Sequence, residues 1–125
     1  MNDRLPETTQ IMRMLNRSAI VGTPKQPFLD WLQTVDPTSP TITLQELANE
    51  PSIYLIPECE TDDDVARVLH DLCEEIFVEE LDGWYRDPTT WPQDRSFDVF
   101  CLWFDYCHHS VLNDLSDKPL RPHSY

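Results

Sequence analysis

The hydrophobic positions divide the chain into short segments with two different periods. Residues 18–24 and 53–56 are short β-prone runs, and each is closed by a proline. Four further segments carry apolar side chains at the spacing of a helix: residues 27–35, 43–48, 61–82 and 96–115. The pattern therefore predicts an α+β domain in which two or three short β-strands pack with about four α-helices.

The order of these segments suggests a β-α-α-β-α-α pseudo-repeat. Its two strands lie far enough apart in sequence for a parallel crossover. Two strands make a marginal sheet, so a third is expected from residues 110–115 or from a second copy of the chain. For residues 110–115 we favour a helix, because the helical period of 96–115 continues unbroken through them.

Several helix ends are recognisable from single residues. Thr43 and Glu46 have the spacing of a capping box. Thr61 and the three aspartates after it suit the start of a long helix, since carboxylates favour the positive end of its dipole. Gly83 suits its end, and Ser96 is placed to cap the last helix.

The segments outside these elements set the expected limits of the domain. We expect a disordered extension over residues 1–13, one domain over 14–118 and a tail over 119–125. The extension lacks the apolar stretch of a signal peptide, and the longest apolar run, 99–104, is too short to span a membrane. These features predict a cytoplasmic protein without a membrane segment, whose four cysteines are reduced.

The net negative charge of the chain favours some classes of binding partner over others. The chain has 125 residues, 23 Asp and Glu, 9 Lys and Arg, and a net charge of -14. Between Glu58 and Asp82 stand eleven carboxylates and a single base, Arg67. Such a surface repels phosphate backbones, so direct binding of nucleic acid is disfavoured and a basic protein partner is expected. With only 2 glycines, a glycine-rich phosphate loop is excluded.

The predicted partner-binding surface combines this acidic helix with the aromatic residues that follow it. Acidic residues steer association, and Trp and Tyr are frequent at binding hot spots, although they are equally ordinary core residues. The last predicted helix is apolar on more than one side, which leaves a homodimer open. The candidate contact residues are Asp71, Glu74, Glu75, Glu79, Asp82, Trp84, Tyr85 and Trp91.

The alternative function is a small enzyme. On helical wheels, Glu80 and His108 each fall within the apolar stripe of their predicted helix. Buried polar groups need partners, so a Glu80–His108 pair between the last two helices is the candidate acid/base site. The other possibility is that both residues lie at a helix end, where the apolar stripe no longer faces the core and the side chains are exposed to solvent.

No cofactor and no metal site is predicted. His70 and Cys73 are one turn apart, and Cys101, Cys107 and His109 cluster near the end of the chain. Zinc uses such ligands, but the chain has no C-x-x-C pair, and cysteine is also a normal core residue.

Three phrases carry a resemblance to a known family. Residues 16–32 (NRSAIVGTPKQPFLDWL), 53–58 (IYLIPE) and 81–85 (LDGWY) resemble a family of small, acidic, uncharacterised bacterial proteins. The resemblance covers about residues 14–118 and implies a bacterial cytosolic source and a shared fold. It implies no activity, cofactor or site residue.

Overall fold

A three-stranded antiparallel sheet in the order β3-β2-β4 forms the centre of the molecule. The computed structural model describes residues 13–38 and 41–123. Strand β2 (Ser18–Pro24) lies in the middle, between β3 (Ser52–Ile56) and β4 (Phe104–His109). The predicted α+β class is confirmed.

The predicted helices all begin within one residue of the predicted position, and the first three also end within two residues of it. They are α1 (Gln26–Val35), α2 (Leu44–Ala48), α3 (Asp62–Trp84) and α4 (Phe97–Trp103), with a 3₁₀ turn η2 at Pro88–Thr90. The capping box is confirmed, because the backbone N–H of Glu46 donates to Thr43 Oγ1 over 3.1 Å and that of Thr43 donates to Glu46 Oε1 over 3.2 Å. The hydroxyl oxygen of Thr61 accepts from Asp64 N over 3.1 Å and caps α3.

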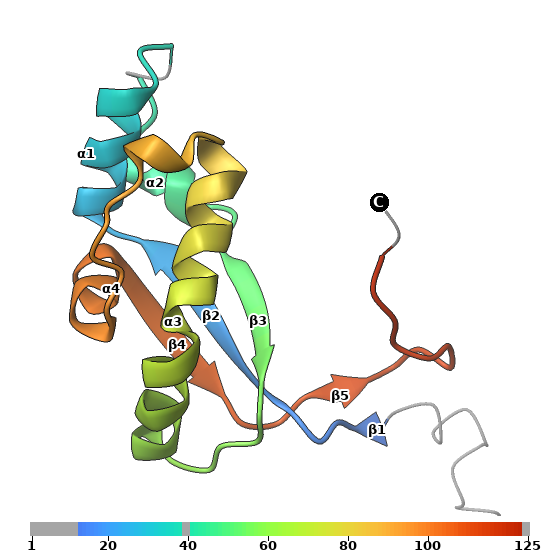
Figure 1. Cartoon of the computed structure of the whole chain (residues 1–125). Helices are drawn as coiled ribbons and strands as arrows, with labels where there is room; N and C mark the ends of the chain where they lie inside the picture. Colours follow the sequence, from blue (N-terminus) through green and yellow to red (C-terminus); the bar gives the residue numbers. More distant parts are fainter. Residues whose placement is uncertain (1–12, 39–40, 124–125) are drawn as a thin grey trace, which may run out of the picture.

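Helix α3 lies across one face of the sheet, as Figure 1 shows. Strand residues that point toward it, such as Ile20 and Phe104, are fully or almost fully buried. Phe77 of α3 joins the two layers, with ring centroids 5.2 Å from Phe104 and 5.3 Å from Trp103. Phe28 of α1 also reaches Phe104, at 5.5 Å, so an aromatic cluster forms the centre of the core.

The prediction of one helix over residues 96–115 is wrong beyond Trp103. Residues 104–109 form β4 and pair with β2 in antiparallel register, with Ile20 opposite His108 and Pro24 opposite Phe104. The segment alternates buried or half-buried and exposed residues with a period of two, as a half-buried strand does. Because β2 presents unpaired backbone groups on this side, strand pairing overrides the local helical pattern. The third strand of this sheet is therefore β4. It is formed neither by residues 110–115 nor by a second copy of the chain.

The expected parallel crossover is also wrong, although the order β-α-α-β-α-α occurs in β2 through α4. Strands β2 and β3 run antiparallel, with Ser18 opposite Ile56 and Gly22 opposite Ser52. The reason is visible in Figure 1: α1 and α2 stay at the end of the sheet where β2 finishes and β3 starts. The chain therefore does not travel back along the sheet between the two strands.

A second, two-stranded sheet joins the two ends of the described chain. Strands β1 (Arg13–Met14) and β5 (Asn113–Asp114) pair antiparallel and project away from the helices (Figure 1). The predicted helix over 110–115 does not form: residues 113–114 are the strand β5, and the residues on either side belong to no helix or strand. Of the predicted extension, residues 1–12 lie outside the described part of the chain, as do residues 124–125 of the predicted tail.

Candidate functional site

A groove lies between the edge strand β3 and the helix α3. Its volume is about 360 Å³, and its lining residues are Tyr54, Leu55, Ile56, Leu72, Glu75, Ile76 and Glu79. Ile56, Leu72 and Ile76 contribute aliphatic side chains, whereas Glu75 and Glu79 are exposed carboxylates one helical turn apart. The groove therefore offers apolar contact with negative charge beside it.

One face of β3 forms the strand side of this groove, because the side chains of the strand alternate between its two faces. Tyr54 and Ile56 point toward α3, and Ile56 is only 2% exposed. Ile53 and Leu55 point to the opposite face, where they are 68% and 51% exposed. Because side chains alternate along a strand, the same five residues present one surface to the groove and another to the open face of the sheet.

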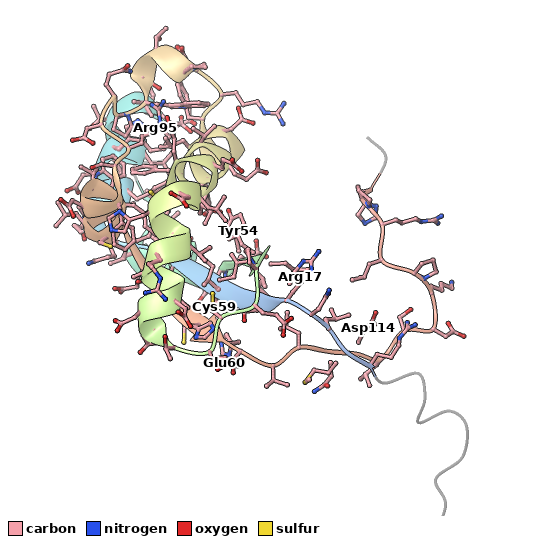
Figure 2. The ribbon with its side chains drawn as sticks, turned by 60° about the horizontal axis from the view of Figure 1, so that its bottom comes forward. Arg17, Tyr54, Cys59, Glu60, Arg95 and Asp114 are labelled. Atoms are coloured by element: carbon pink, nitrogen blue, oxygen red, sulfur yellow. The ribbon has the colours of Figure 1, made fainter. Side chains whose placement is uncertain are left out.

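Tyr54 and Glu80 connect the two elements of the groove. The Tyr54 hydroxyl donates a hydrogen bond to Oε2 of Glu80, whose residue is 9% exposed. Figure 2 shows Tyr54 on the β3 side of α3. Burial, followed by the hydrogen bond and the charge of Glu80, raises the pKa of Tyr54 well above that of an ordinary tyrosine. The phenol stays protonated and acts as a donor that holds β3 against α3.

The predicted Glu80–His108 pair does not form. His108 Nδ1 lies 4.0 Å from Asp62 Oδ1, at the first turn of α3. Glu80 follows Asp62 by 18 residues, which corresponds to about 27 Å along a helix. The pair requires residues 96–115 to form one helix, whereas His108 lies on β4. Its Nε2 is buried and has no hydrogen-bond partner among the described residues.

The predicted acidic contact residues fall into two groups. Glu74 pairs with Arg95 over 3.1 Å, and Asp82 pairs with Arg86 over 3.7 Å. Asp71, Glu75 and Glu79 are exposed, and no basic side chain of the described chain forms an ion pair with them. Their spacing of four residues places these three carboxylates along one line of α3.

The predicted aromatic contact residues lie away from the groove, at the end of α3 and in the loop after it. The indole N–H of Trp91 donates to the backbone oxygen of Tyr85 over 2.9 Å, and both side chains are half-buried against the core. Trp84 is 42% exposed. The groove instead uses the side chains of Tyr54, Ile56, Leu72 and Ile76, which the sequence did not mark as contact residues. The available signal was the β-prone run at residues 53–56, but it does not show which helix lies beside the strand.

Two of the residues weighed as metal ligands, His70 and Cys73, have structural contacts. The His70 ring lies 4.3 Å from that of Phe97, and Cys73 is buried with its Sγ 3.8 Å from the backbone oxygen of Arg95. Within residues 13–38 and 41–123, no three His, Cys, Asp or Glu side chains are grouped so that they could hold a metal ion.

Comparisons of the chain with protein-family models, curated proteins and solved structures find no match. No helix in the described part of the chain has the length and apolar character needed to cross a membrane. The groove and its charge are therefore the features of the molecule that bear on its function.

Proposed function

We propose that this protein is a non-enzymatic interaction module that binds a basic protein partner at the groove between α3 and β3. The observation that carries the proposal is an apolar groove lining beside Glu75 and Glu79, two exposed carboxylates without an ion pair to any base of the described chain. Lysine and arginine have apolar stems and charged ends. Their stems fit against Leu72 and Ile76, while their ends reach the two carboxylates.

The charge of the whole chain supports a basic partner. A net charge of -14 attracts cationic proteins over long distances and speeds their association. The same charge repels nucleic-acid phosphates. Because exposed charges supply steering more than affinity, the apolar lining of the groove provides the remaining binding energy.

A comparison of variants tests this proposal. Tagged wild-type protein, the variant Glu75→Gln/Glu79→Gln and a control variant Glu50→Gln/Asp117→Asn are used to capture proteins from a lysate of the source cells. The control removes the same charge from exposed positions outside the groove. Washes at about 0.1 M and about 0.5 M salt separate charge-dependent binding from the rest.

The expected result is a discrete basic protein, identified by mass, that is retained at low salt by the wild type and by the control. The groove variant loses it, and high salt releases it. The purified partner should then bind the groove variant at least about tenfold more weakly than the control. Equal binding by both variants, or capture of no basic protein, would overturn the proposal.

A further inference from the structure

Strand β3 is an edge of the sheet. In the described part of the chain it pairs with β2 and has no neighbour on its other side. Alternate residues of an edge strand direct backbone N–H and C=O groups outward, where they can pair with another strand. The five residues of β3 are thus a template for an added strand beside the proposed groove.

On the face of the sheet that points away from α3, which we call the open face, apolar side chains of β2 and β3 form a row. This row ends at the edge strand β3. Val21 lies opposite Ile53 and Ala19 opposite Leu55 on that face, and both β3 side chains are more than half exposed. A strand added next to β3 places every second side chain beside Ile53 and Leu55. Apolar side chains at these positions would extend the row and cover part of it.

The other side chains of an added strand point toward α3. On that face the neighbours are Tyr54 and Ile56, with Glu75 and Glu79 on the adjacent helix. Positive side chains at these positions would meet the unneutralised carboxylates. One occupant therefore accounts for both the charged groove and the exposed apolar row.

We infer that β3 accepts an extended segment of a partner protein as a fourth strand of the sheet. The segment carries Lys or Arg at alternate positions, facing Glu75 and Glu79, and β-branched or other apolar residues between them, beside Ile53 and Leu55. This inference rests on the proposed function and specifies the conformation and the sequence pattern of its partner.

A second copy of this chain fits the edge poorly. Symmetric antiparallel pairing of two β3 strands would bring Glu75 and Glu79 of both copies to the same face across the new pair. Each chain already has a net charge of -14, so this arrangement adds repulsion where the edge would need attraction. Charge complementarity favours a basic segment.

The C-terminal tail of the same chain also fits poorly, although Leu120 and Arg121 lie near Leu55. Pro119 and Pro122 have no backbone N–H, and their spacing is odd. Because alternate residues face the neighbouring strand, one of these two prolines always falls on a position that should donate to β3. The tail therefore cannot pair continuously along the strand.

The test uses short synthetic peptides and the full chain. An acetylated, amidated peptide that alternates lysine and valine is compared with a peptide of the same composition in which all lysines precede all valines. Two further alternating peptides carry N-methyl groups on the lysine residues only or on the valine residues only. Binding is measured by fluorescence anisotropy, with the wild type and with Glu75→Gln/Glu79→Gln.

The alternating peptide should bind at least about tenfold more tightly than the peptide with separated lysines and valines. One N-methylated peptide, whose methyl groups face β3, should lose at least about tenfold in affinity, while the other retains binding. This difference between the two methylated peptides is the signature of a hydrogen-bonded strand. A charged groove alone would not produce it.

A matched pair of protein variants tests the open face. Leu55→Lys places a charge in the apolar row, and Leu102→Lys makes the same change on α4, where Leu102 is 62% exposed. Both residues are exposed, so both variants should keep the wild-type circular dichroism spectrum. Only Leu55→Lys should weaken binding of the alternating peptide by at least about tenfold.

Two outcomes would overturn strand addition. If both lysine-valine arrangements bind equally and both lose affinity for Glu75→Gln/Glu79→Gln, the proposed function stands but the strand does not form. If no peptide binds, strand addition is wrong, and capture of the natural partner then decides the proposed function by itself.

Discussion

Tyr54 of β3 donates a hydrogen bond to Glu80 of α3, across 26 positions of sequence. These two elements are the two sides of the proposed binding groove. The bond therefore fixes the position of the edge strand against the helix that carries Glu75 and Glu79. It gives Glu80 a structural role in place of the acid/base role considered from the sequence.

Replacement of Tyr54 by phenylalanine should destabilise the fold. The Tyr54→Phe variant leaves the buried Glu80 carboxylate without its donor, which costs about 1–3 kcal/mol of unfolding free energy. Urea denaturation followed by circular dichroism measures this cost. In a double-mutant cycle with Glu80→Leu, the double variant should lose less unfolding free energy than the sum of the losses in the two single variants. Additivity to within about 0.5 kcal/mol would contradict a direct interaction.

The same pair predicts a loss of stability at alkaline pH. The pKa of Tyr54 in the folded chain is raised above the 10.0 of an ordinary tyrosine, mainly by burial and then by Glu80. Between these two values the unfolded chain binds fewer protons, so the unfolding free energy falls as pH rises. The contribution is complete below pH 10 and is lost as pH rises through the folded-state pKa.

Comparison of the wild type with Tyr54→Phe isolates this effect, because all other titrating groups are common to both. Below about pH 9 the two curves should run parallel, and above about pH 10 the unfolding free energy of the wild type should fall more steeply than that of the variant. Parallel curves would show that the Tyr54 pKa is not raised by folding.

The four cysteines should differ in their reactivity. Cys59 and Cys73 are 4% and 2% exposed, and burial raises the pKa of both thiols. Cys107 is exposed on β4. Alkylation of the native protein, followed by mass spectrometry of its peptides, should label Cys107 first and Cys59 and Cys73 only after unfolding. Equal labelling of all four in the native state would contradict this packing.

The aromatic cluster should carry more stability than the exposed apolar residues. Phe77 is fully buried, and its ring centroid lies within 6.3 Å of those of Phe100, Trp103 and Phe104. Phe77→Ala should cost about 3–5 kcal/mol of unfolding free energy. Leu102→Ala, at a position 62% exposed, should change it by about 0.5 kcal/mol or less. Similar effects in urea denaturation would argue against the described core.

Local chemistry determined much of the fold and could be predicted from the sequence. Thr43 caps α2 and Thr61 caps α3, in both cases through residues only three positions away. Pro24 and Pro57 mark the ends of two strands, since proline cannot donate to a sheet ladder. The acidic run from Glu58 to Asp82 is also a property of the sequence, and it led to the expectation of a basic partner.

Tertiary structure alone decided the groove and the fate of His108. The apolar pattern after Ser96 fits a helix, yet residues 104–109 pair with β2, because the unpaired backbone groups of that strand require a second neighbour. This pairing joins residues 80 to 90 positions apart, from Pro24 with Phe104 to Ala19 with His109, so no local window contains it. It places His108 beside Asp62 at the start of α3, whereas Glu80, near the other end of the helix, accepts a hydrogen bond from Tyr54. The sequence determined which residues carry charge, and strand pairing decided which of them meet.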